Sequence, residues 1–294
     1  MRISVTAPAA LPAAPIRHLP NPARPANLPL SMERLLLVLS TLCFLFGFAY
    51  TMYSLGARVY HPSRLNLISI LVGFGLQTAF LTLRGQAIQR CPLTNLFEVL
   101  VFLCWSMVIF YLLIGSAYRL SLLGAFTSPL VFVIQVVALL LPEAAPAKDH
   151  AAASAWLELH AALSVVSYGA FALACVAGVM YLAQERQLKT HHIHSVFYRL
   201  PPIRDLAVAN RRLIFFGFGL FTIGLAAGWM HGPAHVPLLR IVSVGNWLLY
   251  GFILTATLWH RISPRRVALL SVGAFSVMLL TLWGIQFVPA KGSL

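Results

Sequence analysis

The chain has 294 residues, of which 60% are hydrophobic and only 10% are charged. Soluble domains carry about 25% charged residues, so this composition excludes a soluble globular protein and indicates a polytopic membrane protein. The 21 Lys and Arg residues outnumber the 7 acids and give a formal net charge of +14. We interpret this excess as the basic loops of a membrane protein rather than as a nucleic-acid surface.

Residues 1–31 form an N-terminal tail rich in Pro and Ala, with seven prolines between Pro8 and Pro29. The tail has no apolar core of the signal-peptide type, so we expect it to be disordered. Met32 is an alternative candidate for the start of translation. The membrane domain is expected over residues 32–290.

Eight apolar stretches follow, each close to the roughly 20 residues that a transmembrane helix needs. They lie at about 34–55, 65–83, 94–115, 119–141, 156–183, 212–230, 238–259 and 266–288. The sequence therefore predicts an all-α membrane bundle of about eight transmembrane helices, the fifth of which is long enough to project beyond the bilayer. It contains no phosphate-binding loop and no hydrolase or zinc-protease motif, which favours a protein that is not an enzyme.

The basic residues predict the orientation in the membrane, because cytoplasmic loops carry an excess of Lys and Arg. The richer side holds Arg58, Arg64, Arg119, Arg186, Lys189, Arg199, Arg204, Arg211, Arg212, Arg261, Arg265 and Arg266. We therefore expect a bacterial inner-membrane protein with both termini outside and the loop 184–211 in the cytoplasm.

The stretch CPLTNLFEVLVFLCW, residues 91–105, places a carboxylate inside an apolar span. Such a charge costs about 2.5–3.5 kcal/mol at the centre of a bilayer, so Glu98 marks a candidate functional site. Thr94 or Asn95 is expected to cap the helix that begins here. Trp105 lies on the same helical face as Glu98, seven residues later.

His160 lies near the outer end of the fifth span, and helical spacing places Ser164, Ser167, Tyr168 and Phe171 on its side. One imidazole, two hydroxyls and aromatic walls suit a planar apolar ligand with an axial nitrogen donor. The alternative is a histidine that is hydrogen-bonded between helices.

Three further histidines are candidates for the same chemistry. His260 ends the seventh span, where the alternative is an interfacial belt of Trp, His and Arg. His231 and His235 lie in the short outer loop between spans six and seven, and either one is able to face His160. Gly232 and Pro233 exclude a helical zinc site there. The four cysteines form no C-x-x-C pair, which excludes a disulfide relay of that type.

Three stretches resemble a known family. RGQAIQRCPLTNLFEVLVFLCW is similar to the segment that enters a core helix of the CcsA-type cytochrome c assembly proteins. WLELHAALSVVSYGAFALACVAGVMYLAQERQLK resembles their histidine-bearing helix. LPPIRDLAVANRRLIFFGFGLFTIGLAAGW is similar to the next loop and helix of the smaller HemX-like and YpjD-like members. The resemblance runs from about residue 34 to residue 288.

The resemblance implies a haem-handling membrane protein, since CcsA-type proteins carry haem across the membrane and present it for attachment to apocytochrome c. His160 then corresponds to an external axial ligand of a non-covalent, b-type haem iron, and His260 to a histidine on the helix after the tryptophan-rich segment. His231 or His235 is a candidate second axial ligand. Glu98, Tyr168 and Trp105 would surround the ligands.

The chain also departs from the CcsA pattern. It has no tryptophan-rich WWD segment between spans six and seven, and no histidine at the end of its last span. Gln77 stands on the second span, where related proteins carry an intramembrane histidine. These departures resemble the HemX-like branch, whose described role is to tune the level of glutamyl-tRNA reductase in haem synthesis.

Two roles remain open for Glu98. It is either a structural acceptor, which bonds Ser164 or Tyr168 or pairs with Arg84 or Arg90, or it accepts a hydrogen bond from a haem-ligating imidazole and fixes its tautomer.

Three functions remain open for the protein. The first is handling or presenting haem for c-type cytochrome maturation, alongside other assembly subunits. The second is regulation of haem synthesis, in which the loop 184–211 binds a biosynthetic enzyme or its protease. A small-molecule permease is the third, weaker alternative.

Overall fold

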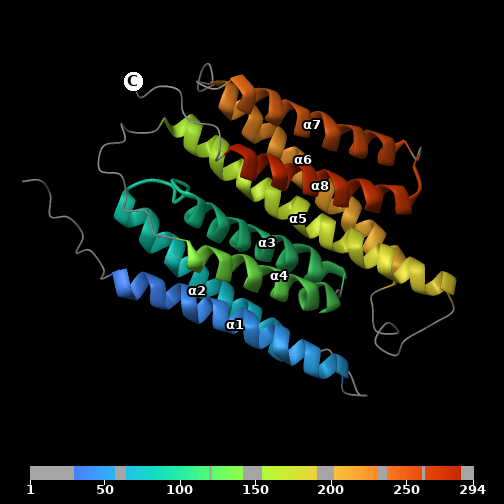
Figure 1. The fold of residues 1–294 in the computed structure, drawn as a ribbon, viewed down its shortest axis with the longest axis horizontal. Helices are drawn as coiled ribbons and strands as arrows, with labels where there is room; N and C mark the ends of the chain where they lie inside the picture. Colours follow the sequence, from blue (N-terminus) through green and yellow to red (C-terminus); the bar gives the residue numbers. More distant parts are fainter. Residues whose placement is uncertain are drawn as a thin grey trace, which may run out of the picture.

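The computed structural model describes residues 30–56, 64–118, 121–141, 154–190, 202–230, 237–259 and 262–285 (Figure 1). Of the N-terminal tail expected at residues 1–31, residues 1–29 lie outside the described residues, and the first helix begins at Leu30. His231, His235 and His260 also lie outside the described residues.

Every described element is an α-helix, and there are eight of them in these residues. They are α1 (Leu30–Gly56), α2 (Arg64–Ile88), α3 (Leu96–Tyr118), α4 (Ser121–Leu140), α5 (Ala155–Thr190), α6 (Ile203–Met230), α7 (Pro237–Leu258) and α8 (Pro264–Ile285). Seven are long and apolar enough to cross a membrane, and α4 contains a shorter apolar stretch, Phe126–Leu140. The predicted all-α, multi-pass architecture is confirmed.

Two helices are longer than their apolar spans. The 36 residues of α5 measure about 54 Å at 1.5 Å per residue, well beyond a hydrocarbon core of about 30 Å. The sixth span was expected to begin at residue 212, yet α6 begins at Ile203. Its first turn is formed by hydrogen bonds from the amides of Asp205 and Leu206 to the Pro202 carbonyl. Hydropathy locates only the part of a helix that lies in lipid, and it misses a polar first turn.

Helix α5 lies in the middle of the molecule and contacts both groups of neighbouring helices. On one side α1 packs against α2 and α4, while α3 packs against α4 and α5 (Figure 1). On the other side α6 runs along α5, and α7 and α8 complete the layer. Any site on α5 is therefore positioned by both halves of the bundle.

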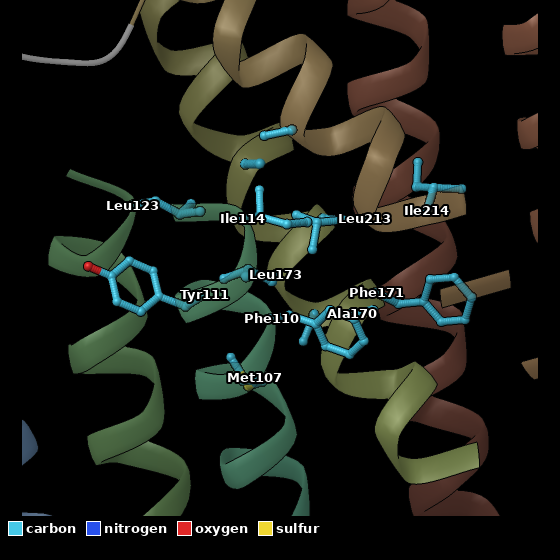
Figure 2. Packing of buried hydrophobic residues seen from close by; sticks show 14 of the residues in the cluster. Met107, Phe110, Tyr111, Ile114, Leu123, Ala170, Phe171, Leu173, Leu213 and Ile214 are labelled. Carbon is cyan, nitrogen blue, oxygen red and sulfur yellow. The ribbon is translucent and has the colours of Figure 1, made fainter. Parts of the chain in front are cut away.

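The largest apolar core has members on all eight helices, most of them on α3, α5 and α6. Figure 2 shows Phe110 and Ile114 of α3, Leu173 of α5 and Leu213 of α6 gathered in this core. The backbones of α3 and α5 approach closely at Gly169, where an added Cβ would overlap the Ser106 side chain and lie 2.9 Å from the Met107 nitrogen. Small residues allow this approach between membrane helices.

Candidate functional site

His160 lies in the second turn of α5, and the residues before it determine where that helix begins. The amide of Leu157 bonds to the Ser154 carbonyl at 2.9 Å and to its Oγ at 3.3 Å, so Ser154 caps the helix. The imidazole is half-buried. It therefore lies close to one end of the bundle, partly within the packed helices.

The imidazole packs against two glycines of α6. Its Nδ1 atom lies 2.7 Å from the carbonyl oxygen of Gly224. A Cβ at Gly228 would lie 2.7 Å from the same Nδ1 atom, so a glycine at this position leaves room for the ring. The two glycines are four residues apart, which is the small-x-x-x-small spacing that brings membrane helices together.

This contact determines which nitrogen carries the proton in the neutral ring. A carbonyl oxygen only accepts hydrogen bonds, so Nδ1 is the protonated nitrogen and donates to Gly224. The lone pair is then on Nε2, which makes no hydrogen bond to any described residue. Metal-ligating histidines commonly have this arrangement, with one nitrogen anchored to a backbone carbonyl and the other directed to the metal.

The face of α5 below His160 carries the hydroxyl and aromatic groups that helical spacing predicted. Ser164 is buried, and its Oγ atom has no hydrogen-bond partner within the described part of the chain. Tyr168 packs edge-to-face on Phe221 of α6, with 5.9 Å between the ring centroids. Phe171 stacks on Tyr250 of α7 at 3.6 Å. Aromatic rings of α5, α6 and α7 thus form a layer beneath the free hydroxyl of Ser164.

Glu98 is completely buried in a second polar cluster, which joins α1, α2 and α3. Its Oε1 atom accepts a hydrogen bond from Arg84 Nε at 2.9 Å, and Arg84 Nη1 lies 3.3 Å from Glu33 Oε2. The other carboxylate oxygen of Glu98 accepts from the amide and the hydroxyl of Thr94, at 2.8 and 2.7 Å. Both oxygens are therefore occupied.

These contacts answer the two questions that the sequence left open at this helix. Asn95 is the cap, because its Oδ1 accepts from the Glu98 amide at 2.9 Å, while Thr94 bonds the carboxylate. Pairing of Glu98 with Arg84 is confirmed. The alternative, in which Glu98 orients an imidazole, is wrong for His160, because that ring turns toward α6 and its Nδ1–H donates to the carbonyl of Gly224.

The loop between α2 and α3 brings the two clusters to the same end of the bundle. Gln89, which follows α2, has a positive φ of 55°, and the Arg90 amide bonds to the Gly85 carbonyl, which ends the helix. Cys91 follows in this loop. Burial raises the pKa of the Cys91 thiol, and the negative charges of Glu158 and Glu98 raise it further. Cys91 thus lies within electrostatic range of both α5 and the Glu98 cluster.

Trp105 has other partners than His160. Its indole nitrogen donates to Thr78 Oγ1 at 2.9 Å, and its ring stacks on Phe74 of α2 at 5.9 Å. Tyr168, in contrast, lies two turns below His160 on the same helix. Within the described residues no three His, Cys, Asp or Glu side chains group as a metal site.

Two features of the site were not predicted from the sequence. The first is Gly224 with Gly228, which the G-x-x-x-G spacing in FTIGLAAGW could have suggested. The second is Glu33, whose part in the Arg84 ion pair has no local signal, because α1 and α2 meet only in the folded bundle.

Comparison with known proteins places these features in a family. The model of the family described as "Cytochrome C assembly protein" matches residues 93–291, which include the Glu98 and His160 helices. Protein HemX of Brevibacillus brevis is 31% identical over 173 residues, which cover 58% of this chain and 63% of HemX, less than two thirds of its length.

Two of the similar proteins are named cytochrome c biogenesis protein CcsA. The protein from Guillardia theta is 27% identical over 228 residues, which cover 67% of this chain and 74% of the relative. The protein from Prochlorococcus marinus (strain MIT 9301) is 25% identical over 287 residues, which cover 85% and 91%. Because the family model matches more than half of the chain, this multi-pass membrane protein belongs to the cytochrome c assembly protein family.

Proposed function

We propose that this protein binds haem non-covalently and handles or presents it for the maturation of c-type cytochromes, by ligation rather than by turnover. The observation that carries the proposal is the imidazole of His160, whose Nδ1 is held at 2.7 Å from the Gly224 carbonyl while Nε2 remains available. Membership of the cytochrome c assembly protein family supports the same function.

The residues around His160 fit a haem. The neutral imidazole with a free Nε2 is the usual protein ligand of haem iron. The free Ser164 hydroxyl lies one turn away, and the aromatic pair of Tyr168 and Phe221 makes the interior behind it apolar. Bound haem would supply a planar apolar ring and an iron with axial positions to fill. The protein orients His160, holds its proton on Nδ1, and excludes lipid with α6.

We further propose that His231 or His235 is the second axial ligand. Gly228 packs against the imidazole of His160, and His231 follows Gly228 by only three residues along the chain. His260 follows α7 at the opposite end of that helix, and we propose it as a separate ligand at the other membrane face.

The Glu98 cluster would support the site from α1, α2 and α3. Glu98 fixes Thr94 and, through Arg84, the position of Glu33. The charges of both Glu98 and Glu158, at the start of α5, raise the pKa of the Cys91 thiol in the loop before α3. The cluster therefore holds the ends of three helices next to the end that carries His160.

The direct test is the absorption spectrum of the detergent-purified protein, oxidised and then reduced with dithionite. We expect a Soret band in the wild type, its loss in His160→Ala with an unchanged gel-filtration profile, and its retention in the control His18→Ala. A Soret band that is unchanged in His160→Ala would reject the assignment. His231→Ala, His235→Ala and His260→Ala then locate the other ligands.

A second candidate function is regulation of haem synthesis, and two observations favour it. The relative at 31% identity is a HemX, and α5 and α6 extend past their apolar spans into the proposed cytoplasmic loop 184–211. This extension carries an exposed ion pair between Glu185 and Lys189, and Arg265 of α8 lies 3.4 Å from Glu185.

An alkaline phosphatase fused within residues 191–201 tests the orientation of this loop. The enzyme is active only outside the cytoplasm, so an inactive fusion is expected. Affinity capture with an intact 184–211 loop, compared with a loop-substituted chain, tests for an enzyme partner.

A further inference from the structure

A stripe of buried polar side chains runs along the contact between α1, α2 and α4. On α2 its members are Asn66, Ser69, Gln77 and Arg84, and the buried Gly73 contributes its backbone carbonyl between Ser69 and Gln77. Their spacing keeps them on one helical face. The 18 residue-to-residue steps from Asn66 to Arg84 span about 27 Å, close to the thickness of the hydrocarbon core. The stripe therefore crosses most of a bilayer.

The outer part of the stripe is a hydrogen-bonded group from four helices. Ser40 of α1 donates to the Gly73 carbonyl of α2 at 2.8 Å, and Gln135 of α4 donates to Ser40 Oγ at 3.3 Å. Gln77 lies one turn beyond Gly73 on α2 and donates from Nε2 to the Val101 carbonyl of α3 at 2.9 Å. Gln135 is thus bonded to the turn of α2 that precedes Gln77, through Ser40 and the Gly73 carbonyl.

The inner part repeats this arrangement around Gly47 of α1. A Cβ on Gly47 would lie 2.8 Å from Asn66 Oδ1, 3.4 Å from Ser69 Oγ and 3.6 Å from Ser128 Oγ. Oxygens from α2 and α4 therefore converge where α1 has no side chain. Ser69 also donates to the Cys43 carbonyl of α1, which links this group toward the outer one.

Three amide oxygens of the stripe have acceptor capacity that the protein does not use. Gln77 Oε1, Gln135 Oε1 and Asn66 Oδ1 are buried and accept no hydrogen bond from the described residues. Gln77 and Gln135 are completely buried, and Asn66 is 8% exposed. Burying an acceptor without a donor costs free energy, so such groups in folded proteins are normally paired.

Interhelical hydrogen bonds between small polar residues stabilise membrane bundles, and this explains Ser40 and Ser69. It does not explain three unused amide oxygens on the packed helices α2 and α4. Water fits them, since it donates two hydrogen bonds and a buried site needs two to four polar partners. Each glutamine nitrogen carries a second hydrogen beyond its single bond, which water can accept. A cation fits less well, because the acids Glu33 and Glu98 are already paired with Arg84.

We propose that α1, α2 and α4 enclose a file of ordered water molecules, held by the amide groups of Gln77, Gln135 and Asn66. The file has two segments, one at the group of Ser40, Gln77 and Gln135 and one at the group of Gly47 and Asn66. The buried apolar side chains of Leu37, Phe80 and Leu81 separate the first segment from the ion cluster of Glu33, Arg84 and Glu98. It is separate from the proposed haem site, which lies between α5 and α6.

Hydroxyl-radical footprinting of the full chain in lipid nanodiscs tests the file, because radicals formed from internal water oxidise the side chains next to it. Phe44 is the probe, since it is 1% exposed and its Cζ lies 3.1 Å from the position of a Cβ on Gly73. Phe221, equally buried at 1%, is the matched reference in an aromatic environment. We expect Phe44 to be oxidised several-fold more than Phe221.

The variants Gln77→Met and Gln135→Met remove the amides with little change in side-chain shape, and each should reduce the oxidation of Phe44 several-fold. Gln86→Met is the control, as Gln86 lies exposed on α2. Equal oxidation of Phe44 and Phe221 in the wild type would overturn the proposal, as would oxidation of Phe44 that neither variant reduces. If both variants fail to fold, the ratio of Phe44 to Phe221 oxidation in the wild type is sufficient to accept or reject the proposal.

Discussion

The Nδ1 atom of His160 lies 2.7 Å from the carbonyl oxygen of Gly224, so a backbone group of α6 orients an imidazole of α5. Helix α6 can perform this role because positions 224 and 228 are glycines. At both positions an added Cβ would come close to α5, at 3.2 Å from Leu163 Cβ and 2.7 Å from His160 Nδ1. Orientation of the proposed ligand therefore depends on residues that carry no functional group.

Gly228→Ala is expected to displace the imidazole and to weaken haem binding while the fold is kept. Loss of a group that orients a metal ligand typically costs about 10–100-fold in affinity. Haem titration of the purified apoprotein, followed at the Soret band, measures the change. Gly219→Ala is the matched control on the same helix, because its Cβ would meet nothing within 4 Å. Equal haem affinities of the two variants would contradict the role of Gly228.

Glu98→Ala should destabilise the protein more than any other single loss of an acid. It leaves Arg84 buried beside Glu33, without its 2.9 Å contact to Glu98, and frees the Thr94 amide. Breaking a buried ion pair by removing one partner costs about 3–5 kcal/mol. Membrane levels and thermal unfolding in detergent measure the effect.

The reference for Glu98→Ala is Glu143→Ala, at a position outside the described residues. Similar expression, unfolding temperature and haem content of the two variants would show that the cluster does not hold the helix ends. Glu98→Gln should fall between them, since an amide oxygen still accepts from Thr94 but no longer balances the charge of Arg84.

Gly169→Ala tests the close approach of α3 and α5, on which the position of the whole α5 helix depends. The new methyl group would overlap Ser106 and lie 2.9 Å from the Met107 backbone nitrogen, which cannot move aside by a change of rotamer. Overpacking of this kind costs about 1–3 kcal/mol. The unfolding temperature should fall relative to the wild type, whereas Gly273→Ala on α8, which has open space around its Cβ, should not lower it. An equal fall of the unfolding temperature in Gly169→Ala and Gly273→Ala would mean that α3 and α5 can accommodate the extra methyl group without loss of stability.

The sequence predicted where the helices lie but not how their polar groups pair. Runs of about 20 apolar residues specify a helix in lipid whatever surrounds it, so all eight helices were expected near their observed positions. The partners of Glu98 and His160 come from other helices, and helical spacing contains no information about contacts between helices. Pairing with Arg84 was therefore one of several open alternatives, and the Gly224 carbonyl was not expected. The roles of His231, His235 and His260 remain predictions.

The reactivity of Cys91 should report on the end of the bundle where the two clusters meet. Burial raises the pKa of its thiol above the ordinary value of 9.0, with smaller contributions from the charges of Glu158 and Glu98. The thiolate is the reactive form, so at a given pH near neutrality Cys91 holds less thiolate than an exposed cysteine. Alkylation by iodoacetamide should thus be slow at pH 7 and should rise at higher pH than for a free thiol.

Glu158→Gln removes one negative charge near the thiol, so the pKa of Cys91 should fall and alkylation should become faster at every pH below it. The measurement uses a chain in which Cys43, Cys104 and Cys175 are replaced by Ala, with the label quantified by mass spectrometry. Glu143→Gln is the control for the loss of a charge elsewhere. Because burial is the larger cause, the shift caused by Glu158→Gln should be partial, and Cys91 should still react more slowly than an exposed cysteine. A pH profile that Glu158→Gln leaves unchanged would place the start of α5 away from the α2–α3 loop, and would separate the Glu98 cluster from the His160 site.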